Sequence, residues 1–164
     1  MDKNNDFKEK MTFKIVLYQP EIPINTGNIG RLCLGANAEL HIIKPMRFFI
    51  NDKYLKRAGM DYWDKVQLFI HDDFDTFLKS LNNNRIFFCT TKSTNSYHIN
   101  QYKIGDVFVF GPESRGLPED MLNKYKNDLI TIPMHKEIRS INLCNSVSII
   151  LYEALRQQNF SFLV

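Results

Sequence analysis

Glycine, cysteine and long hydrophobic runs are all scarce in this chain, and each shortage argues against a class of protein. Only 7 of the 164 residues are glycine, and neither the Gly-x-Gly-x-x-Gly pattern of dinucleotide-binding folds nor the Gly-x-x-x-x-Gly-Lys-Ser/Thr pattern of a P-loop occurs. No apolar run approaches the about 18 residues that a membrane-spanning helix requires. Residues 1–12 alternate charges around no apolar core, which argues against a secretory signal. We therefore expect a cytoplasmic protein with no membrane partner and no phosphate loop of these kinds.

The 3 cysteines are too few and too widely spaced for a disulfide framework. Cys33, Cys89 and Cys144 each lie in an apolar segment, form no Cys-x-x-Cys pair, and have no cluster among the 4 histidines to join. We interpret them as buried thiols of a reducing compartment and predict no metal site. The net charge of +3 is compatible with an RNA partner and equally with an ordinary soluble enzyme.

Short apolar segments alternate with helical patterns along the chain. The predicted strands are 14–18, 40–43, 66–70, 85–89, 106–110 and 129–132. This alternation predicts an α/β fold, with a mainly parallel six-stranded sheet that helices cover on both faces. One domain over residues 13–164 accounts for the length, after a flexible polar tail of residues 1–12.

The helices between the strands have recognisable starts. Asn25 or Thr26 can cap the first one, and Gly30 inside it costs on the order of 1 kcal/mol relative to alanine. A short basic helix is expected at 52–59, Asp73 caps the next, and Pro118 stands as the first residue of another.

The last helix has the strongest pattern. Five apolar residues recur at helical spacing and predict one buried face over 143–157: Leu143, Val147, Ile150, Leu151 and Ala154. The loop 135–141 before it is too polar to pack, and it delivers backbone N–H groups and Ser140 to the start of the helix. Such a start is a place to bind a ligand.

A second polar turn follows the strand at 106–110. The run Gly111-Pro112-Glu113-Ser114-Arg115-Gly116 makes a rigid turn, whose backbone can approach a ligand with no Cβ in the way. The residues alone are equally compatible with a plain connection from strand to helix.

Three motifs together resemble one enzyme family. They are Asn25-Thr26-Gly27-Asn28 with Arg31, then FGPESRGLP at 110–118, then Ile132-Pro133-Met134 with Arg139-Ser140-Ile141-Asn142-Leu143. With them the chain resembles the SpoU/TrmH branch of the SPOUT methyltransferases over residues 14–158, and within it the bacterial tRNA 2′-O-methyltransferases of the wobble nucleotide. The resemblance implies a homodimer packed through the last helix. It also implies a C-terminal deep trefoil knot, against which general topology rules would argue.

The resemblance also implies the cofactor and where it binds. S-adenosylmethionine is expected against the backbone at Cys89, Gly111 and Ile132, with Ser140 and Leu143 closing the adenosine side. The substrate is expected to be tRNA, and the nucleophile the ribose 2′-hydroxyl of nucleotide 34, cytidine or a modified uridine.

Three side chains are the predicted catalytic residues: Arg31, Asn25 and Asn142. Arginine has a pKa above about 12 and so stays protonated in proteins. We therefore expect Arg31 to bind a phosphate and stabilise the alkoxide, not to act as a base. Glu113 is expected to orient a loop N–H. For Asn142 and Asn145, helix capping or contacts across a dimer are as compatible with the sequence as substrate contact.

Basic and aromatic residues interleave in one stretch, as in many RNA-binding surfaces. They are Lys44, Arg47, Phe48, Phe49, Lys53, Tyr54, Lys56, Arg57 and Tyr62. A solvated charged face explains the same stretch equally well. Two other functions also stay open: a 2′-O-methyltransferase for ribosomal RNA or another tRNA position, and a catalytically silent RNA-binding module on the same fold.

Overall fold

One parallel sheet forms the centre of the protein. The computed structural model describes residues 12–50 and 61–163, and its strands lie in the order β3-β2-β1-β5-β4-β6. The strands are β1 (Lys14–Tyr18), β2 (Glu39–Ile43), β3 (Leu68–His71), β4 (Ile86–Cys89), β5 (Val107–Phe110) and β6 (Leu129–Ile130). The longer helices are α1 (Pro23–Gly35), α3 (Phe74–Lys79), α4 (Glu119–Lys124) and α5 (Leu143–Gln157). Every described pair of strands is parallel, so the predicted fold class is confirmed.

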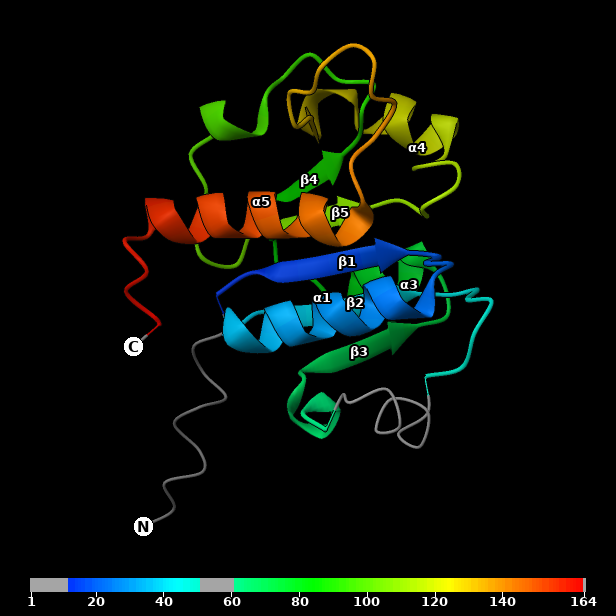
Figure 1. Cartoon of the computed structure of the whole chain (residues 1–164), viewed down its shortest axis with the longest axis vertical. Helices are drawn as coiled ribbons and strands as arrows, with labels where there is room; N and C mark the ends of the chain where they lie inside the picture. The colour runs from blue at the N-terminus through cyan, green and yellow to red at the C-terminus, as the bar shows by residue number, and fades with distance from the viewer. Residues whose placement is uncertain (1–11, 51–60, 164) are drawn as a thin grey trace.

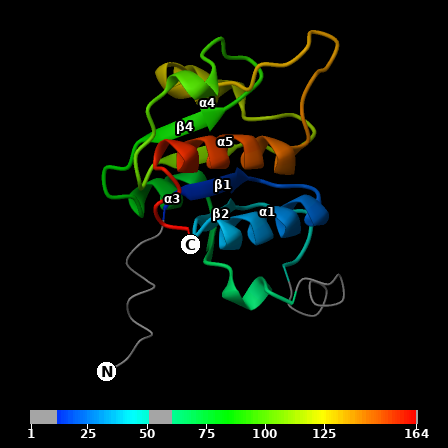
Figure 2. The ribbon, with the colours of Figure 1, turned by 60° about the vertical axis from the view of Figure 1, so that its left-hand side comes forward.

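Helices cover both faces of this sheet. Successive side chains of a strand point to opposite faces, and β1 divides accordingly. Ile15 and Leu17 belong to the buried cluster that contains the apolar residues of α1 and α5, whereas Val16 belongs to the cluster with Phe77 of α3 and Met121 of α4. Figures 1 and 2 show α1 and α5 side by side on one face. The layered arrangement is therefore the predicted one.

The first helix begins earlier than predicted. Pro23 stands in its first turn, and Ile22 is the capping residue without a side-chain hydrogen bond. Proline is tolerated there because its missing N–H would have no helical partner and its φ angle is already helical. Asn25 and Thr26 lie inside the helix and are buried, so the prediction that one of them caps it is wrong.

Other boundaries also differ from those predicted, most of them by one or two residues. Val66 ends a 3₁₀ turn, Trp63–Lys65, so β3 begins only at Leu68. Strand β6 ends at Ile130, and Thr131 makes an isolated bridge with Ser96. Pro118 precedes α4 as its capping residue. Each difference is a matter of a few residues at an element's end, where side-chain periodicity carries least information.

Gly30 has a packing reason. A Cβ at this position would lie 2.2 Å from Cζ3 of Trp63, so the indole ring packs directly against the bare helix backbone. Trp63 is 6% exposed, and burial of a ring of this size offsets the helix-propensity cost of the glycine.

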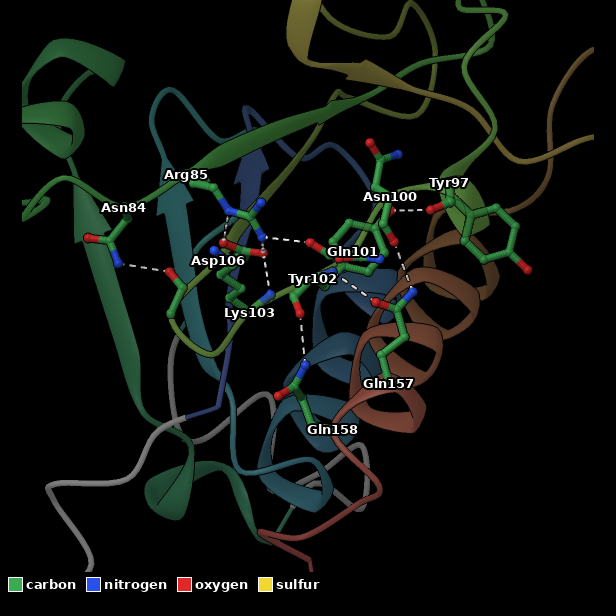
Figure 3. Close-up of polar contacts among 11 residues, drawn as sticks. Asn84, Arg85, Tyr97, Asn100, Gln101, Tyr102, Lys103, Asp106, Gln157 and Gln158 are labelled. Atoms are coloured by element: carbon green, nitrogen blue, oxygen red, sulfur yellow. Dashed lines mark hydrogen bonds and ion pairs between the residues drawn. The ribbon is translucent and has the colours of Figure 1, made fainter.

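Both ends of α5 are tied to the rest of the fold. At its start, Asn142 Oδ1 accepts from Cys144 N at 2.9 Å. At its end, the Gln157 amide accepts from Tyr102 N at 2.8 Å and donates to Asn100 O at 3.0 Å, as Figure 3 shows. Gln158 Nε2 adds a hydrogen bond to Tyr102 O at 2.8 Å. The helix that leads out of the predicted binding loop is thus held in a defined position.

Thr12, the first of the described residues, has a buried hydroxyl that donates to Ala36 O at 2.9 Å. The predicted helix at 52–59 and the rest of the predicted tail lie outside the described residues. Within 12–50 and 61–163, no helix is long and apolar enough to cross a membrane. The trefoil knot stays a prediction, because strand pairing does not record how the chain is threaded.

Candidate active site

A pocket of about 450 Å³ opens where β4, β5 and β6 end. Its walls are the segments 89–92, 110–117, 130–134 and 139–143, together with the first turns of α5. The carboxyl edge of a parallel sheet is the usual place for a ligand in open α/β folds. The volume falls in the range of about 300 to 1,000 Å³ that is typical of small-molecule and cofactor sites.

The residues predicted to bind the cofactor all meet in this pocket. Cys89, Gly111, Ile132, Ser140 and Leu143 come from four separate segments and line the same cavity. The segment before α5 brings the last two there, and Figure 1 shows it in orange, descending to the start of the helix. The structure therefore brings together every residue of the predicted cofactor set, and their role in binding stays a prediction.

Gly111 cannot carry a side chain. A Cβ at this position would lie 2.3 Å from Leu117 N and 2.4 Å from the carbonyl carbon of Gly116. No real Cβ tolerates such contacts, and the neighbouring atoms are backbone that cannot move aside. The turn at 111–117 is thus folded tightly back on itself, with a bare backbone at the pocket wall.

A chain of hydrogen bonds joins this turn to α1 and α5. The Glu113 carboxylate accepts from Glu21 N at 2.8 Å, from Ile22 N at 3.1 Å and from Asn25 Nδ2 at 3.2 Å. Asn25 Oδ1 in turn accepts from Asn142 Nδ2 at 3.2 Å. Two of the predicted catalytic residues, Asn25 and Asn142, are therefore in direct contact and both line the pocket.

The two roles considered for Asn142 coexist in the structure. Its Oδ1 caps α5 while its Nδ2 donates toward Asn25 in the pocket wall. Glu113 orients loop N–H groups as predicted. It also accepts a hydrogen bond from the Asn25 side chain, which the prediction did not include. Asn145 is exposed and supplies its backbone N–H to the Asn142 cap at 3.4 Å.

Glu21 mirrors Glu113 across the same junction. Its carboxylate accepts from the hydroxyl and from the N–H of Ser114, both at 2.9 Å. These hydrogen bonds lower the pKa of Glu21, and the charges of Arg47 and Arg115 add to the lowering. Arg115 also donates to Gln19 Oε1 at 2.8 Å. The segment after β1 and the turn after β5 are therefore locked together by two reciprocal carboxylates.

Arg31 lies apart from this network. It is exposed on α1, its guanidinium stands 5.6 Å from the centre of the Tyr62 ring, and it is not among the described residues that line the pocket. Burial raises the pKa of Tyr62, and the nearby Arg31 charge opposes that rise. The predicted catalytic arginine is thus presented to solvent, on the same helix as Asn25.

Basic side chains that sequence reasoning did not assign to the site also line the pocket. They are Lys92, Arg115 and Arg139, all exposed. Arg115 and Arg139 lie within the motifs that also contain predicted cofactor residues. Their closeness in sequence to those residues was a signal that could have been used. Lys92 follows β4 in a loop without any local pattern, and only the pairing of β4 with β5 and β6 brings it to the rim.

The pocket cysteine is a neutral thiol. Burial raises the pKa of Cys89 well above its usual value, and burial raises that of Cys33 and Cys144 as well. A thiolate nucleophile is therefore disfavoured at all three positions. Cys33 is buried as predicted, whereas Cys89 and Cys144 are half-buried. In the described residues no group of three or more His, Cys, Asp or Glu side chains is placed to hold a metal ion.

The comparison with known families bears on the same segments. The model of the SpoU rRNA Methylase family matches residues 12–152, which include all the pocket walls. The chain belongs to the SpoU methylase family. The resemblance inferred from three short motifs is therefore confirmed over most of the chain.

Individual members of the SpoU methylase family are similar over nearly their whole length. The tRNA (cytidine(34)-2'-O)-methyltransferase of Escherichia coli (strain K12) is 48% identical over 147 residues, 89% of this chain and 94% of that protein. The tRNA (cytidine(34)-2'-O)-methyltransferase of Methylovorus glucosotrophus (strain SIP3-4) is 45% identical over 150 residues, 91% of this chain and 97% of that protein. A solved structure concerned with the 2-OH methylation of C/U34 on tRNA matches with a TM-score of 0.84 and 42% identity, covering 90% of this chain and 97% of that one.

Proposed function

We propose that the protein is an S-adenosylmethionine-dependent tRNA 2′-O-methyltransferase that modifies the ribose of nucleotide 34, cytidine or a modified uridine. The observation that carries this proposal is that five residues from four separate segments line one pocket: Cys89, Gly111, Ile132, Ser140 and Leu143. Family membership alone would leave ribosomal RNA open as the substrate. The full-length similarity to proteins named for cytidine 34 favours the wobble nucleotide.

The pocket fits S-adenosylmethionine in size and in character. Its volume is about 450 Å³, apolar Leu117 and Ile150 lie beside polar Ser140 and Thr131, and the bare backbone of Gly111 leaves room for close approach. When bound, the cofactor supplies an electrophilic methyl group on a positive sulfonium. The residues of the chain position the two reactants and exclude water, which is most of what such a transfer requires.

Asn25 and Asn142 are the side chains best placed to meet the ribose. Both line the pocket, and the Glu113 carboxylate fixes the Asn25 amide through a hydrogen bond of 3.2 Å. An amide held in this way offers a preorganised contact to a hydroxyl whose oxygen becomes negative during the reaction. Arg31 would bind the phosphate beside the target ribose, and its exposed, permanently charged guanidinium suits that task.

The basic rim suits an RNA substrate. Lys92, Arg115 and Arg139 surround a pocket whose substrate is a polyanion, and each phosphate contact adds an electrostatic term to binding. We also propose, from a tRNA substrate, that the protein acts in the cytoplasm.

A homodimer is part of this proposal. Apolar side chains remain exposed on the two adjacent helices: Ile24, 62% exposed, on α1, and Tyr152, 42% exposed, on α5. The exposure of Tyr152 excludes a place in the core of one chain and is compatible with a place in an interface. Two copies facing each other through α1 and α5 would remove these side chains from water.

A direct assay tests the function. The protein is incubated with labelled S-adenosylmethionine and total tRNA from cells that lack the modification, and the labelled nucleotide is mapped by mass spectrometry. We expect one 2′-O-methyl group at nucleotide 34 of a small set of tRNAs. Label in ribosomal RNA only, or at another tRNA position, would replace this function with the alternative within the family. No transfer to any RNA would favour a silent binding module.

A further inference from the structure

One aromatic side chain stands free in water at the pocket edge of the sheet. Phe49 is 89% exposed, the highest value among the large hydrophobic residues that the structure describes as exposed. It lies in the loop that follows β2, drawn in cyan in Figure 1. Because β2 runs parallel to β1, and β1 to β5, this loop leaves the sheet at the same edge as the pocket-forming turns.

The loop around Phe49 is anchored. Met46 and Ile50, on either side of it, pack against the buried cluster that contains α1 and α5. The N–H of Lys44 at the start of the loop donates to His71 O at 3.0 Å. The flanking residues therefore hold Phe49 outward, which leaves a large apolar surface in water without a structural reason.

An exposed positive charge, Arg47, stands two residues before Phe49 in the same loop. Hydrogen bonds from Ser114 contribute most to the lowered pKa of Glu21, and the charge of Arg47 adds to the lowering. Ser114 itself lines the pocket. Ser114 donates to the Glu21 carboxylate, and Arg47 and Phe49 are both exposed in the loop after β2.

We propose that Phe49 and Arg47 form a second contact site for the substrate RNA, in which Phe49 stacks on an unpaired base near the target nucleotide and Arg47 binds the adjoining phosphate. The inference rests on the proposed function. Aromatic stacking combined with a nearby cation is the usual way in which proteins bind unpaired nucleotides. A second copy of the chain could also cover an exposed ring, but the flanking Lys44 and Arg47 favour a polyanion, since charged residues are depleted from the cores of protein interfaces.

Kinetics on the full-length dimer with tRNA provide the first test. We expect Phe49→Ala to raise KM for tRNA by about 5-fold to 150-fold, the cost of one lost base stack, and to leave kcat nearly unchanged. Phe49→Trp should restore KM, because the stacking surface is kept. Arg47→Ala should weaken tRNA binding and reduce its salt slope by about 0.7, the contribution of one phosphate contact on a single strand. The matched control is Ile99→Ala: Ile99 is 67% exposed and lies next to Asn100, at the far end of α5.

Fluorescence provides a test that needs no methyl transfer. Trp63 is the single tryptophan of the sequence and is buried, so Phe49→Trp adds an exposed reporter. We expect an anticodon-arm RNA to quench the Phe49→Trp protein, and not the Ile99→Trp protein.

Three outcomes overturn the proposal: an unchanged KM in Phe49→Ala, equal quenching of both tryptophan variants, or a weaker dimer in Phe49→Ala, which would mean that a second copy covers the ring. If the wild-type protein does not methylate nucleotide 34, that result contradicts the proposed function and not this contact site. Quenching of the Phe49→Trp protein by RNA would still decide this contact site.

Discussion

Gly111 is a position where the pocket wall has no room for a side chain. We expect Gly111→Ala to weaken binding of S-adenosylmethionine at least about tenfold and to lower stability by roughly 1–3 kcal/mol, because its Cβ would lie 2.3 Å from Leu117 N and force the turn open. Calorimetric titration and urea unfolding measure the two effects.

Gly35 offers a matched control for that variant. A Cβ there meets nothing within 4 Å, and the residue closes α1 away from the pocket. Gly35→Ala should keep cofactor affinity and leave stability equal or up to about 1 kcal/mol higher. Cofactor binding by Gly111→Ala at the wild-type level would mean that the turn is not part of the site.

Arg31 is predicted to act on the RNA and not on the cofactor. It stands on the exposed side of α1, outside the pocket lining, so Arg31→Ala should bind S-adenosylmethionine normally and lose methyl transfer by about a hundredfold or more. Arg31→Lys should recover only part of the rate, because a lysine cannot bind a phosphate with two parallel N–H groups. Undiminished turnover in Arg31→Ala would discard the role.

At the scale of elements, α5 couples its own stability to the site through Asn142. The residue caps the helix and also donates to Asn25. Asn142→Ala should lose about 1 kcal/mol of unfolding free energy and should also lose turnover. Asn142→Asp keeps a capping oxygen, so its stability should stay near that of the wild type, but it has no amide to donate.

Comparing the two variants separates the roles of Asn142. If both lose turnover and only Asn142→Ala is destabilised, the amide acts in the site. Full turnover in Asn142→Asp would reduce the residue to a helix cap. Urea unfolding and single-turnover methylation are the two measurements required.

At the scale of the whole molecule, a hydrogen-bonded cluster of titratable side chains makes the free energy of unfolding depend on pH. His41 Nδ1 lies 2.9 Å from His71 Nε2, and His41 Nε2 lies 2.8 Å from Glu39 Oε2, to which Lys14 also donates. Burial lowers the pKa of His41, although Glu39 opposes the shift, and burial lowers that of His71. For Glu39 burial acts upward, but hydrogen bonds from His41 and Lys14 outweigh it and lower the pKa to about 2.

These directions fix the sign of the pH effect. All three groups bind their protons more weakly in the folded state than in the unfolded chain. Their contribution is therefore complete above the ordinary histidine pKa of 6.5 and is lost as the pH falls through the lowered values. A second loss, from Glu39, follows between pH 4.5 and about 2. Unfolding free energies measured from pH 8 to 3 should show both declines, and His41→Gln should reduce the first; constant stability from pH 8 to 5 would contradict the assignment.

The proposed dimer can be tested at the same scale. Tyr152→Asp places a charge on the exposed apolar surface of α1 and α5, and we expect it to raise the dimer dissociation constant at least about tenfold, because burying an unpaired charge is costly. Ile99→Asp, at an exposed position outside that surface, should sediment as the wild type does. A Tyr152→Asp protein that remains fully dimeric in analytical ultracentrifugation would move the interface elsewhere.

Sequence reasoning succeeded where a signal was local. The alternation of apolar runs predicted the six strands, and helical spacing predicted α5 within 143–157, the observed range. It was wrong about the start of α1, because Asn25 or Thr26 was expected to cap a helix that already begins at Pro23. It also missed Lys92, which carries no local pattern.

The residue order alone was enough to predict the layered α/β fold and, through three short motifs, the family, because periodicity and short motifs are properties of neighbouring positions; the predicted cofactor set followed from that resemblance. Only the tertiary structure decided that Glu113, Asn25 and Asn142 form one hydrogen-bonded chain, since these partners are 88 and 117 positions apart. It also decided that Asn25 is buried while Arg31 faces solvent. Contacts of this kind arise from how parallel strands align their carboxyl ends, and no local pattern in the chain encodes that alignment.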